Sequence, residues 1–131
     1  EAHSFPTRRS SDLLRILESN WRDGRRGELD IIARDDTDSS CSWTVVVEVR
    51  TRVGRRRGSA LASVDPRKIA RLRTLTGAWC RAHGPLSSRV RIDVVAITVD
   101  ARALCSWPAA MDEAVDLRAL GAQVTWLRGV Q

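Results

Sequence analysis

The chain has 131 residues, which is the usual length of one domain, and its 43% hydrophobic and 29% charged residues are typical of a globular protein. A formal net charge of +6 indicates a polyanionic partner, nucleic acid first, although a solvated basic surface gives the same charge. The chain has no CxxC pair, and its two histidines are isolated, which argues against a zinc site or a disulfide framework.

The same sequence features bear on the compartment. No apolar run approaches the ~18 residues that a membrane span needs, and the first residues lack the apolar core of a signal peptide. Cys41, Cys80 and Cys105 are widely spaced, as expected of reduced thiols. We therefore expect a cytoplasmic protein with no membrane partner.

The first 13 residues differ from the rest of the chain. The stretch 4–13 resembles a translated sequencing adapter, so we leave it out of the fold argument as foreign to the domain. The alternative is a disordered basic tail, and both interpretations predict no stable structure at residues 1–13. The domain is then expected over residues 14–131.

Three strands are expected next. Residues 14–21 fit a helix turn or a strand, and we favour a strand that ends at the turn signal Asp23-Gly24. Residues 43–49 are β-branched and predict a strand. Between them, residues 28–33 alternate, with Leu29, Ile31 and Ala33 on one face and Glu28, Asp30 and Ile32 on the other. A hairpin or three-stranded meander follows.

A helix is predicted from Asp65 to about Ala82. Asp65 suits the N-cap, a proline occupies the first helical position, and Gly84-Pro85 ends the helix. Its apolar stripe consists of Ile69, Leu72, Leu75 or Thr76, and Trp79. Its first half is basic, with Arg67, Lys68, Arg71 and Arg73. These cations either contact phosphates or form a solvated face.

The last third of the chain is less regular. Residues 90–99 predict a strand and residues 124–127 a final one, while residues 109–120 are compatible with a short helix. The order of elements predicts an α/β fold, with a mixed sheet of four to five strands flanked by helices.

Acidic residues on two of these strands form a candidate site. Period-2 geometry places Glu28 and Asp30 on one face of their strand, and Glu48 and Arg50 on one face of theirs. If the strands pair, three carboxylates converge with one guanidinium, and a divalent cation such as Mg²⁺ would relieve their repulsion. The alternative is a set of structural cross-strand ion pairs on a solvated face.

Several blocks, in order, resemble the bacterial YraN family. They are residues 27–35 (GELDIIARD), 47–52 (VEVRTR), Gly58-Ser59, the set Ala62, Val64, Pro66 and Lys68, and residues 91–96 (RIDVVA). That family is largely uncharacterised, is predicted to have the restriction-endonuclease-like fold, and resembles archaeal Holliday-junction resolvases.

The resemblance implies a metal-dependent phosphodiesterase site of the PD-(D/E)xK type, with Mg²⁺ or Mn²⁺ as cofactor. Asp30 matches the first acid, Glu48 the second, and Arg50 stands at the lysine position. Glu28 accompanies them, and the carbonyl of Val49 would be a further metal ligand. Arginine at position 50 stabilises charge but cannot act as a base.

The function implied is a metal-dependent endonuclease acting on DNA phosphodiester bonds, with branched DNA as one substrate and a homodimer as one assembly. The alternatives are a non-catalytic nucleic-acid-binding module on the same fold and an interaction domain whose acids are structural. The cations expected to contact the DNA backbone follow the second acidic strand or begin the helix: Arg52, Arg55, Arg56, Arg57 and Lys68.

Two further departures from the family pattern concern the fold. The loop around residues 37–42 is about five residues longer than usual, which costs a hairpin little entropy. The helix that begins the family is replaced by the adapter-like segment. We therefore expect a restriction-endonuclease-like core that lacks its first helix, with one sheet face uncovered.

Overall fold

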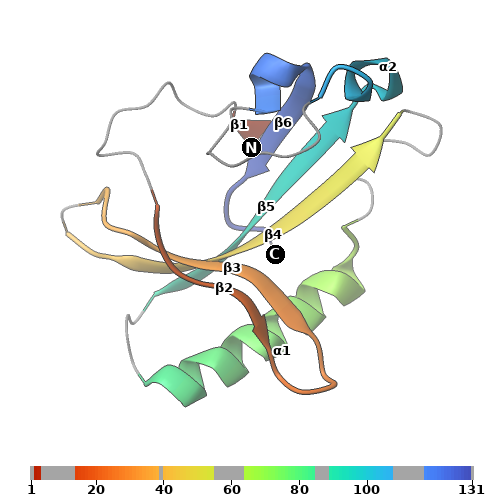
Figure 1. Ribbon diagram of the computed structural model, residues 1–131. Helices are drawn as coiled ribbons and strands as arrows, with labels where there is room; N and C mark the ends of the chain where they lie inside the picture. The colour runs from red at the N-terminus through yellow and green to blue at the C-terminus, as the bar shows by residue number, and fades with distance from the viewer. Residues whose placement is uncertain are drawn as a thin grey trace.

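A computed structural model describes residues 2–3, 14–38, 40–54, 64–84, 89–107 and 117–130. Within these residues the chain forms a six-stranded mixed sheet in the order β1-β6-β5-β4-β3-β2 (Figure 1). The strands are β1 (Ala2–His3), β2 (Arg15–Arg22), β3 (Glu28–Asp35), β4 (Trp43–Val53), β5 (Val90–Val99) and β6 (Ala122–Leu127). The expected α/β fold with a mixed sheet is confirmed.

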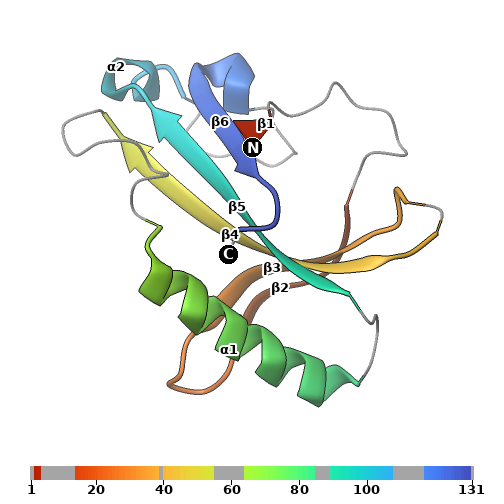
Figure 2. The ribbon, with the colours of Figure 1, turned by 180° about the vertical axis from the view of Figure 1, so that it is seen from behind.

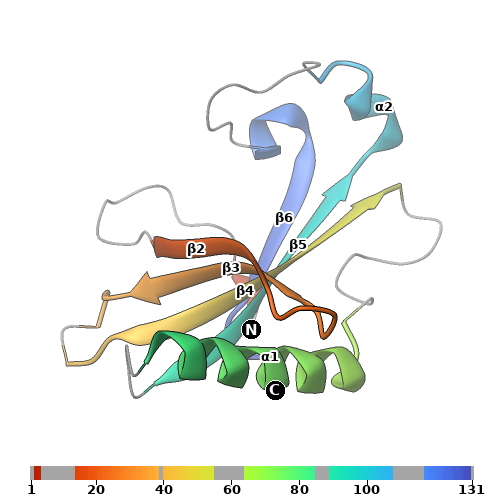
Figure 3. The same ribbon diagram turned by 60° about the horizontal axis from the view of Figure 1, so that its bottom comes forward.

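The long helix α1 (Pro66–His83) lies along one face of this sheet (Figures 2 and 3). Strands β2, β3 and β4 form the predicted antiparallel meander. Strands β4 and β5 pair in parallel, and α1 makes the crossover between them. This ladder continues to the pair Val53↔Val99, which is why β4 extends beyond the predicted end at Val49.

Local sequence signals account for α1. The Asp65 side chain accepts a hydrogen bond from the backbone N–H of Lys68 at 2.8 Å, and Gly84 ends the helix with a φ of 75°. The predicted stripe is buried against the sheet, where it meets Leu29, Ile32, Val46 and Ile92. The core therefore lies between α1 and strands β3, β4 and β5.

The hairpin of β2 and β3 curls toward α1 at its tip (Figure 3). Leu29 and Ile32 are three residues apart, yet both join the cluster that packs on α1. The alternation predicted from sequence put these two side chains on opposite faces, so it does not hold at Leu29. The twist of the hairpin toward the helix explains the difference.

The chain termini differ from expectation in detail. Ala2 and His3 pair with Leu127 and Trp126 at the edge of β6, whereas no structure was expected there. The rest of residues 1–13, and most of the segment expected as a short helix at 109–120, lie outside the described residues. A short helix α2 (Ala101–Leu104) follows β5, and a 3₁₀ turn (Leu117–Leu120) precedes β6.

Among the described residues, no helix combines the length and the apolar character needed to cross a bilayer.

Candidate functional site

The site begins where β3 and β4 separate. Their paired register runs from Asp35↔Trp43 to Ile31↔Val47. Directly beyond it, Oδ2 of Asp30 accepts a hydrogen bond from the backbone N–H of Val49 at 2.8 Å. A side chain thus occupies a donor that a neighbouring strand would otherwise use. This bond holds the Asp30 carboxylate against β4.

Glu48, the neighbour of Val49 on β4, is the second acid and is only 4% exposed. Nζ of Lys68 on α1 lies 2.9 Å from its Oε1, and Nη1 of Arg50 lies 3.6 Å from the same atom. Burial raises the pKa of the Glu48 carboxyl, and the hydrogen bond from Lys68 opposes that rise. The charge of Asp30 and a hydrogen bond between the two acidic side chains raise it further.

The two carboxylates therefore lie side by side, and the net direction of the Glu48 pKa is upward. Two carboxylates in contact share either a proton or a cation, because otherwise their like charges repel in a poorly hydrated site. We call Asp30 and Glu48 the acidic pair.

The acidic pair opens onto a pocket of about 500 Å³ between the β2–β3 turn, β4 and the first half of α1. Its lining includes every residue predicted as catalytic or metal-binding: Glu28, Asp30, Glu48, Val49 and Arg50. The pairing of β3 with β4 thus makes the two acidic faces coincide. The remaining lining comes from the turn and from α1: Arg22, Gly24, Arg25, Gly27, Lys68, Arg71, Leu72 and Leu75.

Glu28 lines the pocket together with Asp30, but its carboxylate is paired with a cation on β2. Its Oε2 accepts from Nε of Arg22 at 2.8 Å, so the side chain is engaged with the neighbouring strand. Across the described residues, no three or more His, Cys, Asp or Glu side chains gather in a way that could hold a metal. The predicted convergence of three carboxylates is therefore reduced to two.

The predicted DNA-contacting cations separate into three groups. Lys68 lies inside the site on Glu48, and not on an outer helix face. Arg52 lies on β4 and does not line the pocket. Arg55, Arg56 and Arg57 fall outside the described residues.

Sequence reasoning missed the part played by the β2–β3 turn. Arg25 lines the pocket from this turn, Arg22 from the end of β2 and Arg71 from α1. The signal available was the density of arginine around Asp23-Gly24. The contact of Lys68 with Glu48 was also missed, and the available signal was that Lys68 is the only lysine in an arginine-rich chain.

Comparison with known proteins identifies the family of this chain. Residues 10–97 match the Uncharacterised protein family UPF0102. The chain belongs to this family. It is the YraN family that the sequence blocks resemble, so that resemblance is confirmed.

Relatives within the family are similar over about two thirds of the chain. A UPF0102 protein of Kineococcus radiotolerans is 51% identical over 88 residues, which are 66% of this chain and 67% of that protein. One of Mycobacterium avium is 46% identical over 68% of this chain and 66% of its own length. One of Leifsonia xyli subsp. xyli is 44% identical over 63% and 64%. The match thus spans about two thirds of each relative.

Proposed function

We propose that this protein hydrolyses phosphodiester bonds of DNA with a divalent cation, Mg²⁺ or Mn²⁺, at the acidic pair, on a restriction-endonuclease-like core. One observation carries the proposal. The carboxylates of Asp30 and Glu48 are in contact beside Lys68 at the wall of an open pocket, and the pKa of Glu48 is raised. A group with a perturbed pKa that lies in a cleft beside a specific charge partner is typical of functional sites.

The donor set fits a hard divalent cation. Mg²⁺ takes one or two carboxylates and fills its remaining positions with water and phosphate oxygens. Asp30, Glu48 and the carbonyl of Val49 would hold the ion, and a positive charge there would remove the repulsion between the two acids. When bound, the ion supplies an activated water and neutralises charge on the scissile phosphate.

The chain's own groups have separate parts in the reaction. The Val49 N–H orients the Asp30 carboxylate, and Lys68 orients the carboxylate of Glu48. Arg50 carries a permanent charge that stabilises the negative charge developing on the phosphate oxygens. The Lys68 ammonium can also give a proton to the leaving oxygen, which arginine at position 50 cannot do.

DNA is the proposed substrate because five cations line this pocket against three carboxylates, in a chain of net charge +6. The proposal includes branched DNA as a substrate and a homodimer as the assembly because the family resemblance implies them. A four-way junction therefore forms one arm of the test, and the mass of the protein–DNA complex reports the assembly.

The test compares the wild type with Asp30→Asn on linear duplex and four-way-junction DNA, in Mg²⁺, in Mn²⁺ and in EDTA. Loss of an outer-shell partner of a metal already costs 10- to 100-fold, so loss of a ligand should reduce cleavage by more than about 100-fold. Asp36→Asn is the matched control, because Asp36 is exposed and pairs with Arg34 away from the pocket.

Metal binding is measured independently through thermal unfolding. Mn²⁺ should raise the Tm of the wild type and of Asp36→Asn, and leave Asp30→Asn unchanged. Cleavage that survives Asp30→Asn would refute the site. Binding of DNA without cleavage in either metal would instead favour the non-catalytic nucleic-acid-binding module.

A further inference from the structure

The β2–β3 turn, residues 23–27, is held firmly above the first half of α1. Inside the turn, the Asp23 N–H donates to the Gly27 carbonyl at 3.0 Å and the Arg26 N–H donates to the Asp23 carbonyl at 2.9 Å. From the helix, Arg71 donates to the Arg26 carbonyl through Nη2 at 3.0 Å and Nε at 3.3 Å. The turn is therefore fixed to the helix that also carries Lys68.

Glycine at position 27 permits this close approach. A Cβ atom there would lie 3.0 Å from Nη2 of Arg71 and 3.0 Å from Cδ1 of Leu75, so these side chains would have to move by a few tenths of an ångström. The φ of 147° at Gly27 is also one that other residues rarely adopt. A side chain at position 27 would therefore strain the backbone of the turn and crowd the Arg71 and Leu75 side chains of α1.

The arginines in and next to the turn differ in what they contact. Arg22 is paired with Glu28, and Arg26 pairs with Asp23 at 3.5 Å. Arg25 is exposed, lines the same pocket as the acidic pair, and makes no hydrogen bond or ion pair within the described residues. A rigid turn thus presents one unpaired guanidinium at the mouth of a pocket with more cations than carboxylates.

We propose that the β2–β3 turn is a phosphate-binding element, and that Arg25 contacts a backbone phosphate flanking the one at the acidic pair. A guanidinium binds phosphate through paired N–H donors. The ligand must then carry at least two linked phosphates, so the site takes a polynucleotide and not a free mononucleotide. This inference rests on the proposed function for the placement of one phosphate at the acidic pair.

The test measures equilibrium binding of a labelled DNA duplex by fluorescence anisotropy over a range of salt, in EDTA so that no strand is cut. Arg25→Ala should weaken binding by about 3- to 10-fold and reduce the slope of log K against log salt by about one. Arg25→Lys should recover most of the affinity. Arg15→Ala, an exposed arginine at the far end of β2, removes the same charge and should leave binding unchanged.

A second variant checks the turn itself. Gly27→Ala keeps Arg25 but strains the backbone of the turn, so it should weaken DNA binding while circular dichroism and the Tm show a folded protein. A mononucleotide competitor should displace the labelled duplex no better than inorganic phosphate does.

The outcomes separate this inference from the proposed hydrolysis. Equal losses in Arg25→Ala and Arg15→Ala would overturn the inference even if the protein cuts DNA. Binding that depends on Arg25 with no cleavage in either metal would support the inference and refute hydrolysis. A wild type that binds no DNA at any salt concentration would overturn both.

Discussion

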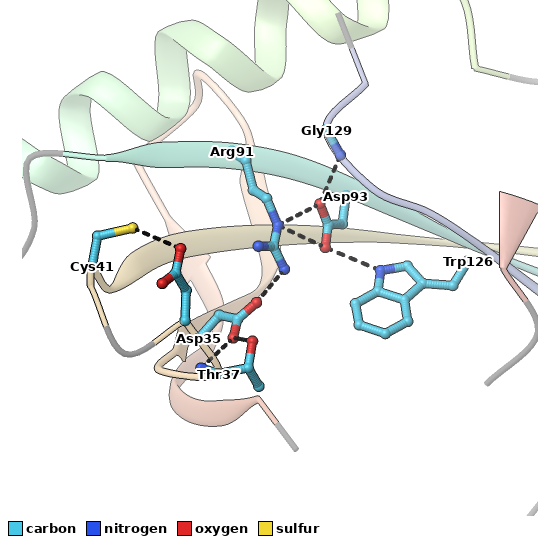
Figure 4. Close-up of polar contacts among 8 residues, drawn as sticks. Asp35, Thr37, Cys41, Arg91, Asp93, Trp126 and Gly129 are labelled. Atoms are coloured by element: carbon cyan, nitrogen blue, oxygen red, sulfur yellow. Dashed lines mark hydrogen bonds and ion pairs between the residues drawn. The ribbon is translucent and has the colours of Figure 1, made fainter. Parts of the chain in front are cut away.

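Two groups of carboxylates lie on the central strands of this sheet, and they differ in the groups that surround their negative charge. Asp93 on β5 is fully buried, and three donors meet it: Nε of Arg91 at 3.1 Å, Nε1 of Trp126 at 3.0 Å and the Gly129 N–H at 2.9 Å (Figure 4). Nη2 of Arg91 also lies 2.7 Å from Asp35. We call Asp35, Arg91, Asp93 and Trp126 the Arg91 cluster.

The acidic pair is nearly as buried at Glu48 but is arranged differently. Glu48 is paired with Lys68 and Arg50, but it also adjoins the carboxylate of Asp30 and faces a pocket. Burial of a carboxylate on a strand therefore does not distinguish a site from a structural contact. The difference lies in the neighbouring groups: three donors meet Asp93, whereas Glu48 also adjoins a second carboxylate, whose like charge is costly in a buried site.

The Arg91 cluster also has an evident structural role. The Gly129 N–H bond and the bond from the Val130 N–H to the Ile92 carbonyl at 2.8 Å tie the segment after β6 back to β5. The ion pair of Arg91 and Asp93 therefore has a structural role.

The largest expected effect comes from Asp93→Ala. Removing this carboxylate leaves Asp35 as the acidic partner of the buried Arg91, and it removes the acceptor of the Trp126 Nε1–H and Gly129 N–H hydrogen bonds. The free energy of unfolding should therefore fall by about 3–5 kcal/mol. Urea unfolding measures it. Asp30→Ala is the comparison and should cost less, because the lost bond from Val49 is offset by relief of repulsion with Glu48. Equal losses would mean that both acids are structural.

A smaller effect is expected from Lys68→Gln, and it should appear in activity. The substitution removes the cation that orients Glu48, so we expect cleavage of DNA in Mg²⁺ to fall by about 10- to 100-fold. The free energy of unfolding should fall less than in Asp93→Ala, since Arg50 remains beside Glu48. Lys68→Arg keeps the positive charge but cannot donate a proton, so it tests these two roles of Lys68 separately. Unchanged cleavage in Lys68→Gln would remove Lys68 from the mechanism.

The smallest effect is a difference in pH dependence between the two regions, measured in EDTA. Burial alone would raise the pKa of Asp35, but hydrogen bonds from the Thr37 hydroxyl and N–H, with Arg91, hold it below 3.8. Asp35 therefore stabilises the fold above pH 3.8, and this stabilisation is lost as the pH falls through its lowered pKa. The free energy of unfolding of the wild type, relative to that of Asp35→Asn, should decrease as the pH falls below 3.8.

Glu48 should show the opposite sign. Its pKa in the folded protein is raised above 4.5, so the folded state binds more protons than the unfolded state between those two values. The wild type should therefore lose stability relative to Glu48→Gln as the pH rises from 4.5 through the raised pKa. Urea unfolding at a series of pH values measures both variants, and slopes of the same sign would contradict the comparison.

Much of the architecture follows from local sequence. Asp65-Pro66 and Gly84 bound α1, its 3.6-residue stripe defines the buried face, and the β-branched runs define β4 and β5, because caps, periods and propensities act over a few neighbouring residues. The spacing of Asp30 and Glu48 also sufficed to expect two acids on adjacent strands, since β3 and β4 are neighbours in the chain.

Other features depend on contacts between residues far apart in the sequence. Lys68 reaches Glu48 only because α1 crosses back over the sheet to make β4 and β5 parallel. The bond from Arg71 to the Arg26 carbonyl spans 45 residues, and it brings Arg25 to the pocket. No local sequence pattern predicts these contacts. The sequence by itself determined the strands, the helix and the two acids, whereas the packing of α1 on the twisted hairpin decided which cations surround them.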